Sequence, residues 1–386
     1  MKRTPLLALL LAVSALLAVL TPRPSLGLER NFAGSAQLDY KFLVSQPNAS
    51  AQPISVDGFI TELALKMAVD VSDHFSANVK VCYGCHGFEM AMGYIDYRVA
   101  DELNFRVGRF SPSFGAFNLR HDPANHHLPD KPLPYDMGRM LRSEQWAEGV
   151  LPSPFPDNGI EINGTHWFGN ALELDYALYA ITGFKADRGA FDLDFDLNRM
   201  PMYWDNNNRP TVGARVATTF RLSTISDITF GASGQYGKYD PDLKFAYAIV
   251  GADVWFRSGR TDLRFEYLAR RQEFDTSNPA AYRYEVPRKG GDFWVKHGAY
   301  IELKQPLSNW IDLIGRVDGM YREGNVQLES PLAQKSTVLR YTLGTMFTIE
   351  QGLRAKLATE LYDFSDVDEA GHHTDVVVNA AIVGTY

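Results

Sequence analysis

Both cysteines of the chain lie in one pentapeptide, Cys82-Tyr83-Gly84-Cys85-His86. Cys-x-x-Cys-His is the attachment pattern of c-type haem. Two thiols at this spacing can each form a thioether with one vinyl group of the same porphyrin, and the histidine that follows can ligate the iron. The motif therefore predicts one haem c, attached through Cys82 and Cys85, with His86 as the proximal axial ligand.

Two other chemistries are open to the same residues. In an exported protein a Cys-x-x-Cys pair can close into a disulfide, although a bare disulfide leaves His86 unexplained. With His86 the two thiolates can instead bind a metal ion, but two sulfurs and one imidazole make an incomplete zinc site.

A long segment over residues 111–158 is the natural source of a second iron ligand. It is too rich in proline for helix or strand, and a long segment without secondary structure is usually functional or disordered. We expect it to fold over or into the lumen described below. The candidate distal ligands are His121, His126, His127, Met137 and Met140. Against this, loop histidines are most often solvated, and methionine in such a loop is often plain packing.

Other polar residues are weaker candidates. His372 and His373 fall in an expected outer loop, whereas His166 and His297 fall on expected strands and fit packing or girdle positions. Asp192, Asp194 and Asp196 alternate with apolar residues. They could bind a cation, but a solvated loop edge is the plainer interpretation.

The N-terminus predicts export. Lys2 and Arg3 precede an apolar run over residues 6–20, and small residues stand at Ser25 and Gly27. This is the pattern of a secretory signal peptide over residues 1–27. No cysteine follows the expected cleavage point, so the sequence does not predict a lipoprotein anchor. Export also suits haem attachment, which takes place outside the cytoplasm.

The mature chain, residues 28–386, alternates apolar and polar residues with a period of two. In residues 36–42, for example, one face holds Ala36, Leu38, Tyr40 and Phe42, and the other holds Gln37, Asp39 and Lys41. No apolar run beyond residue 27 reaches the about 20 residues of a membrane helix. Alternation over roughly ten residues is typical of a transmembrane barrel with lipid outside and water inside.

The connections favour a barrel over a soluble β-sandwich, which also alternates. Short turns are expected near residues 72–73, 101–102, 168–169, 258–259, 308–309 and 351–352, and they alternate strictly with long polar loops. Short periplasmic turns and long extracellular loops are typical of outer-membrane barrels. We predict an all-β, antiparallel transmembrane barrel of about 16 strands, whose last strand alternates up to Tyr386.

Charge and motifs exclude several classes of function. The net charge is −8, and it moves to about −11 once residues 1–27, which hold three bases and no acids, are removed. Such a chain is not expected to bind nucleic acid. The sequence has no Gly-x-Ser-x-Gly elbow, no phosphate-binding loop and no recognisable carboxylate pair, so it does not predict an enzyme.

A local family resemblance adds to this interpretation. Residues 106–115 read Arg-Val-Gly-Arg-Phe-Ser-Pro-Ser-Phe-Gly, and a strand ending in Gly-Arg-Phe, followed by Pro and Phe-Gly, resembles outer-membrane porins of the phosphate-selective type. The resemblance covers roughly residues 90–120 and implies a porin. Ordinary porins carry no cofactor, so the haem motif departs from that pattern.

Two functions follow from these features. In the first, an outer-membrane barrel with one covalent haem transfers electrons, with a periplasmic cytochrome or an extracellular acceptor as partner. In the second, the barrel is a passive diffusion porin for small solutes, and the Cys-x-x-Cys pair is a structural disulfide or metal site. Both place the protein in outer-membrane lipid, and porins of this size are often homotrimers.

Overall fold

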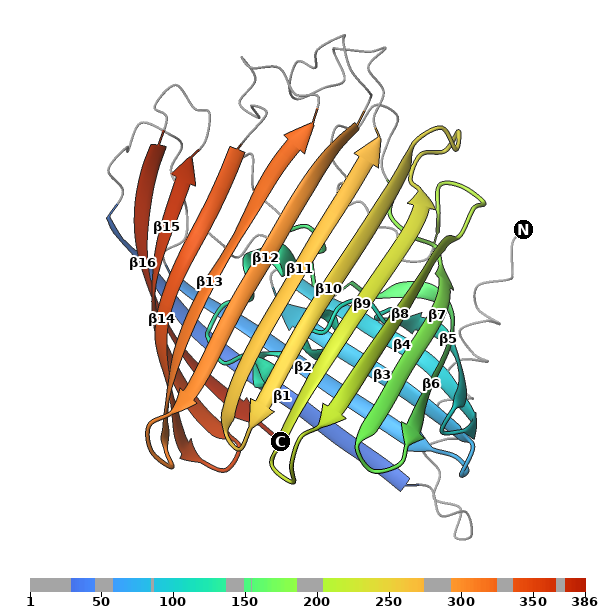
Figure 1. Cartoon of the computed structure of the whole chain (residues 1–386), viewed down its shortest axis with the longest axis horizontal. Coiled ribbons are helices and arrows are strands. Elements are labelled where there is room, and N and C mark those ends of the chain that lie inside the picture. The colour runs from blue at the N-terminus through green and yellow to red at the C-terminus, as the bar shows by residue number, and fades with distance from the viewer. Residues whose placement is uncertain are drawn as a thin grey trace, which may run out of the picture.

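Sixteen antiparallel strands close into one barrel in the computed structural model, with each strand hydrogen-bonded to its neighbours in the chain and β1 to β16 (Figure 1). The structure describes residues 29–45, 58–84, 87–136, 149–153, 155–185, 204–273, 293–324, 336–365 and 372–386. The strands are β1 Glu29–Ser45, β2 Gly58–Asp70, β3 Phe75–Gly84, β4 Gly87–Ala100, β5 Leu103–Phe110, β6 Asp157–Phe168, β7 Leu172–Ile181, β8 Thr211–Arg221, β9 Ser226–Lys238, β10 Ala246–Ser258, β11 Thr261–Glu273, β12 Phe293–Pro306, β13 Ile311–Gly324, β14 Ser336–Glu350, β15 Leu353–Ser365 and β16 His372–Thr385. The predicted fold class and strand number are confirmed.

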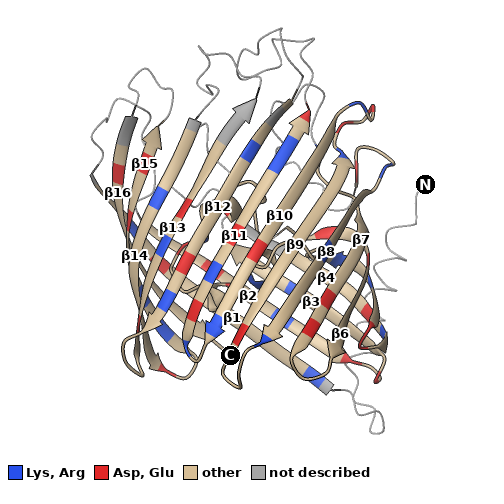
Figure 2. Ribbon diagram, viewed as in Figure 1, with Lys and Arg blue, Asp and Glu red and all other residues tan. Residues whose placement is uncertain are grey.

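The period of two in the sequence becomes an outer and an inner face of the wall. On β1, Leu38 is 45% exposed and Phe42 is 42% exposed, whereas Gln37, Asp39 and Lys41 are buried inside. This is the reverse of a soluble protein, because apolar side chains face outward and charged side chains face the lumen. Figure 2 shows that residues of both charge signs are spread along the strands rather than gathered at the rims.

Short turns join the strands at one end of the barrel, as predicted. Several require a left-handed backbone, which glycine adopts without steric cost. Gly169, Gly259 and Gly352 have φ angles of 66°, 56° and 83° in the turns after β6, β10 and β14. These turns mark the end expected to be periplasmic.

The prediction that short and long connections alternate strictly is wrong at one place. At the end that carries the long connections, Gly84 of β3 pairs with Gly87 of β4, so only two residues connect these strands. The outer loop that was expected to hold His372 and His373 is also shorter than predicted, because β16 already begins at His372. His372 and His373 therefore lie on a strand, in register with Ser365 and Phe364.

Closure between the first and last strands uses the end of the chain. β1 and β16 pair in an antiparallel register that begins with Ser35 opposite Thr385. Beyond this pair, Gly34 and Tyr386 exchange two backbone hydrogen bonds of 3.0 and 3.2 Å. A closed barrel has no unpaired strand edge, which satisfies the backbone within a membrane.

No helix in the described part of the chain is long and apolar enough to cross a membrane. The expected signal peptide at residues 1–27 lies outside the described residues.

Candidate functional site: a segment folded inside the lumen

Cys82 lies on the inner face of β3. It shares this face with Asn78 and Lys80, which are both buried, and it stands opposite Ala64 of β2 in the register. Cys82 therefore faces the lumen. Cys85 and His86 lie outside the described residues, so haem attachment stays a prediction.

Residues 111–136, here called the inner segment, leave β5 and run inside the barrel between its front and rear walls (Figure 1). The prolines of this segment have no N–H to donate to a strand ladder, and it forms only short 3₁₀ turns at Asn118–Arg120, Pro123–Asn125 and Leu133–Tyr135. A sixteen-stranded barrel is too wide for its own side chains to fill. The inner segment occupies part of that space, as predicted from its composition.

The tip of the inner segment is bound to β1 and β15. The carboxylate of Asp130 lies 2.5 Å from the ammonium of Lys41. Gln37 donates to the Pro129 carbonyl at 3.0 Å, and Lys356 donates to two further carbonyls of the segment at 3.0 and 3.3 Å. These inward-facing polar residues therefore anchor backbone that has no partner in the sheet.

A second group of anchors comes from β13 and β14. Arg340 is paired with Asp318 at 2.5 and 2.9 Å and donates to the Lys131 carbonyl at 2.7 Å. Asp318 in turn accepts from the Leu133 amide at 2.8 Å. Both charged side chains are fully buried, so the pair and the backbone of the inner segment satisfy each other away from water.

Glu266 of β11 is a third anchor. Its carboxylate accepts from the Tyr135 hydroxyl at 2.5 Å and the Tyr300 hydroxyl at 3.2 Å. It also accepts from the amides of Ala116 and Phe117 at 2.8 and 3.3 Å. Four donors on one buried carboxylate hold the start and the end of the inner segment at the same point of the wall.

Aromatic side chains pack around these anchors. Phe117 and Tyr135 have ring centroids 5.0 Å apart. Closer to the end of the barrel with the long connections, the ring centroid of Phe184 lies 4.5 Å from that of Phe155 and 5.0 Å from that of Tyr247. All five are buried in one apolar cluster. The hydrophobic core of this barrel therefore lies in its lumen, where the inner segment meets the wall.

The three histidines of the inner segment are buried and hydrogen-bonded rather than solvated. His121 contacts the Asn118 carbonyl through Nδ1 at 2.7 Å and the Lys80 ammonium through Nε2 at 2.8 Å. His126 contacts the His121 carbonyl through Nε2 at 2.7 Å. Since an ammonium can only donate, Nε2 of His121 accepts from Lys80, which fixes a neutral ring.

His127 is held in the same way. Its Nδ1 lies 2.7 Å from Glu302, and its Nε2 lies 3.2 Å from the Arg264 guanidinium. Burial and the neighbouring Lys80 lower the pKa of His121 to about 4. Burial, partly offset by Glu302, also lowers the pKa of His127.

These contacts bear on the predicted distal ligands. Both ring nitrogens of His121 and of His127 are already engaged, and Nδ1 of His126 is buried. Ligation of an iron by any of these histidines stays a prediction. Met137 and Met140 lie outside the described residues, as do Asp192, Asp194 and Asp196. Within the described part of the chain, no cluster of three or more His, Cys, Asp or Glu could hold a metal ion.

The inner segment leaves a cavity of about 440 Å³ beside β5 to β10. Ser113, Ala116, Leu119 and Arg120 of the inner segment form one side of it. A second cavity of about 500 Å³ extends to the short turns at Asp70–His74 and 100–104, and the two share lining residues on β5 to β7. The described lumen is therefore open towards the expected periplasmic end.

Charged residues of both signs line these two cavities, mostly as ion pairs. Arg215 binds Asp253 with two hydrogen bonds of 2.6 and 2.9 Å. Arg106 binds Asp96 at 2.8 and 3.1 Å and reaches Glu161 at 3.3 Å. Such paired walls suit hydrated solutes without a strong overall preference for charge.

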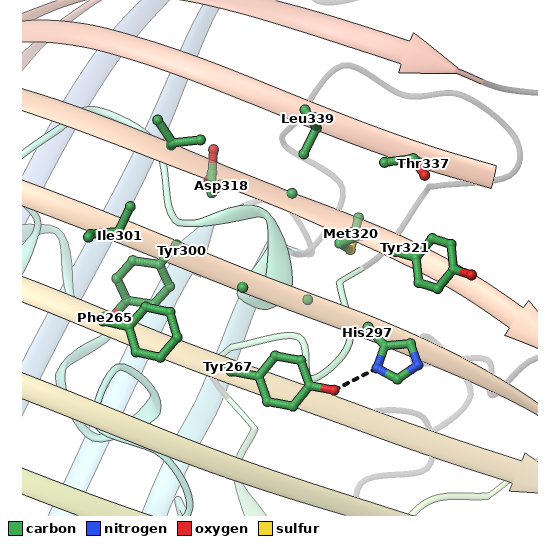
Figure 3. Close-up of a pocket in the computed structure, with 14 residues that line it drawn as sticks. Phe265, Tyr267, His297, Tyr300, Ile301, Asp318, Met320, Tyr321, Thr337 and Leu339 are labelled. Atoms are coloured by element: carbon green, nitrogen blue, oxygen red, sulfur yellow. Dashed lines mark hydrogen bonds between the residues drawn. The ribbon is translucent and has the colours of Figure 1, made fainter. Parts of the chain in front are cut away.

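The outer face has a separate apolar groove over β11 to β14 (Figure 3). Ala299 and Gly319 form its floor, and Tyr267 and His297 lie at one end, joined by a hydrogen bond of 2.6 Å. His297 thus lies on strand β12, as expected, and faces outward. His166 also faces outward. Its ring centroid lies 4.6 Å from that of Phe168, and its Nδ1 lies 3.3 Å from Oε1 of Glu102.

Several residues of the lumen were not singled out by the sequence. Arg340, Arg120, Trp255 and Glu266 belong to no recognisable motif. Their one available signal was an alternating pattern that puts charge on the inner face. Which of these charges meets the inner segment depends on contacts across more than a hundred residues of sequence.

Comparisons with known proteins agree with the barrel. No protein-family model matches the chain. An uncharacterised protein of Aquifex aeolicus is 23% identical over 178 residues, which cover 45% of this chain and 36% of that protein. The chain thus spans about a third of the length of this relative.

Solved structures with the same fold include outer-membrane proteins. The match to Salmonella typhi OmpF in complex with daunomycin has a TM-score of 0.58 at 8% identity, over 93% of this chain and 98% of OmpF. The channel DcaP of Acinetobacter baumannii matches with a TM-score of 0.55 at 10% identity, over 95% and 99%. The trimer form of OmpT from Vibrio cholerae matches with 0.52 at 8% identity, over 93% and 99%. This chain therefore has the fold of a porin-like outer-membrane barrel.

Proposed function

We propose that this protein is a diffusion channel for small hydrophilic solutes in the outer membrane, and that the inner segment determines the size of its passage. One observation carries the proposal. A segment of the chain lies inside a wide barrel, is bound to the wall at β1, β11 and β13 to β15, and leaves a charged cavity beside β5 to β10. A barrel with a purely structural role would not need a segment bound inside its lumen.

Conductance tests the proposal. The full chain would be refolded, checked for heat-modifiable migration and inserted into planar bilayers in KCl. We expect discrete steps that are smaller than those of an unobstructed barrel of the same width, because the inner segment and the aromatic cluster occupy much of the lumen. A correctly folded barrel without steps, both before and after the inner segment is loosened, would contradict a channel function.

A haem-bearing electron carrier is the second candidate. The position of Cys82 on the inner face, two residues from Lys80, supports it, because a porphyrin attached there would meet the lumen beside the inner segment. In that role a periplasmic cytochrome or an extracellular acceptor would be the partner. A homotrimer is also part of the proposal, and light scattering of the detergent-solubilised barrel would measure it.

A further inference from the structure

Three guanidinium groups surround the indole ring of Trp255 in the lumen. The Cζ of Arg120 lies 3.8 Å from the centre of the ring, that of Arg264 lies 4.7 Å from it, and that of Arg257 lies 4.8 Å from it. Arg257 and Arg264 come from the wall, whereas Arg120 comes from the inner segment. An aromatic face attracts cations, but three cations at one ring also repel one another.

Two of the three cations have their own carboxylate. Arg257 binds Asp227 through hydrogen bonds of 2.8 and 2.9 Å, and Arg264 binds Asp262 through 3.1 and 2.9 Å. Within the residues that the structure describes, the Arg120 guanidinium makes no ion pair or hydrogen bond, and it stacks on the ring of Trp255. Among the described residues, the three arginines at Trp255 form ion pairs with two carboxylates, so the cluster carries one excess positive charge.

Arg120 is held in place and faces open space. It is exposed at the end of the turn Asn118–Arg120 and lines the cavity of about 440 Å³. Its neighbours in the chain are fixed, since Asn118 is fully buried and His121 is bound to Lys80. A guanidinium with a fixed base and free donors is suited to bind a planar oxyanion through two parallel hydrogen bonds.

The electrostatic surroundings agree with this geometry. Partial burial, together with the neighbouring Arg264 and Arg257, lowers the pKa of Arg120 to about 10. Burial is the largest cause of this shift, and the like charges of Arg264 and Arg257 add to it, whereas the nearby acid Asp262 opposes it. The group nevertheless stays charged at neutral pH, so that an arriving anion would relieve the repulsion.

We propose that Arg120, backed by Trp255, forms a subsite for the carboxylate or phosphate group of a small anionic solute. The cavity carries Glu173 and Asp175 on β7, so the site is confined to the side of the inner segment and β10. The proposal rests on the proposed channel function, because the ligand must enter the lumen from water.

Collisional quenching of Trp255 fluorescence tests the subsite without requiring conduction. The full-length barrel would be titrated with iodide, an anionic quencher, and with neutral acrylamide. Subtracting the signal of a Trp255→Phe variant isolates Trp255 from the other five tryptophans. We expect Arg120→Gln to weaken iodide quenching by about fivefold, which is the effect of one unit charge about 4 Å away in water. Inorganic phosphate should compete with iodide in the native chain and not in Arg120→Gln.

Two variants serve as controls. Arg120→Lys keeps the charge and should retain most of the iodide effect. Arg221→Gln removes an exposed arginine that stacks on another tryptophan, Trp167, at 4.4 Å, and should leave quenching of Trp255 unchanged. Equal iodide quenching in native and Arg120→Gln protein, with acrylamide reaching Trp255 in both, would overturn the subsite while leaving the channel function intact. If neither quencher reaches Trp255, the lumen is closed to solutes and both proposals fail.

Discussion

The Asp130 carboxylate lies 2.5 Å from the Lys41 ammonium, and both side chains are almost fully buried. One belongs to the tip of the inner segment and the other to the first strand of the wall. The pair thus links two parts of the chain that are separated in the sequence by strands β2 to β5. Breaking a buried pair by removing one partner costs about 3–5 kcal/mol, because the remaining charge loses its compensation.

Removing one member of this pair should loosen the inner segment without opening the barrel. We expect Lys41→Ala to raise the single-channel conductance and to expose the inner segment to limited proteolysis. The sheet keeps its hydrogen bonds, so heat-modifiable migration should persist. The matched control is the double variant Lys41→Met, Asp130→Leu, since apolar replacement of both partners is often neutral. Native conductance in Lys41→Ala would show that this anchor does not hold the segment.

Acid should release the inner segment through its histidines. The pKa of His121 is lowered to about 4 and that of His127 is also lowered, from an ordinary value of about 6.5. The packed arrangement therefore binds fewer protons than the released one. Its stability is complete above about pH 6.5 and falls as the pH drops towards 4. The protonated ring of His121 would face Lys80, and that of His127 would face Arg264.

Conductance recorded between pH 7 and pH 4 would measure this release. We expect the mean conductance to increase on acidification in the native chain. Replacing His121 with Gln, which can accept from Lys80 but does not titrate in this range, should shift or reduce the change. His166→Gln alters an exposed histidine of the outer face and serves as the control. A pH-independent conductance in the native chain would argue against histidine release.

Covalent haem is tested by expression together with the c-type maturation system. If the Cys82 to His86 motif is used, the purified barrel should give a haem-stained band with c-type α absorption. The double variant Cys82→Ala, Cys85→Ala should fold and lose this band, because the thioethers are gone. A folded native barrel without the stain would leave the motif as a disulfide or a metal site, to be separated by thiol titration and by metal analysis.

Barrel closure should depend on the absence of a side chain at Gly34. A Cβ atom at this position would overlap the ring of Tyr386 and lie 2.7 Å from the Ala64 carbonyl oxygen. Overpacking of this kind costs about 1–3 kcal/mol, so Gly34→Val should lower the temperature at which the folded band disappears in gel electrophoresis. A Cβ at Gly384, also at the β1–β16 seam, would meet no atom within 4 Å. Gly384→Val should therefore leave that temperature close to the native value, and an equal loss in both variants would refute the steric argument.

The wall of the barrel was predictable because its signals are local. Alternation between Leu38 and Asp39, continued along every strand, separates an apolar from a polar face within a few residues. Turn residues such as Gly259 and Gly352 mark where strands reverse. These patterns led to the prediction of about sixteen strands. The predicted strict alternation of short turns and long loops failed between Gly84 and Gly87, because the two residues that join β3 to β4 have no composition signal of their own.

The candidate site was predictable only in outline. Proline content was enough to expect that residues 111–158 would form neither helix nor strand, and the histidines were recognised as residues capable of chemistry. Their role was set by contacts that no local pattern encodes. His121 meets Lys80 and His127 meets Glu302 across 41 and 175 residues of sequence, and these partners turn exposed-looking loop histidines into buried anchors.

The sequence by itself determined that the chain makes a wall with an apolar outside and a charged inside, since that depends on the period of two and on side-chain polarity. Only the tertiary structure decided which inner charges are neutralised. Among the residues that the structure describes, Arg257 and Arg264 each pair with a carboxylate and Arg120 does not, because the inner segment brings Arg120 onto the ring of Trp255. The physical reason is that electrostatic balance depends on distances in space, which a residue count along the chain does not contain.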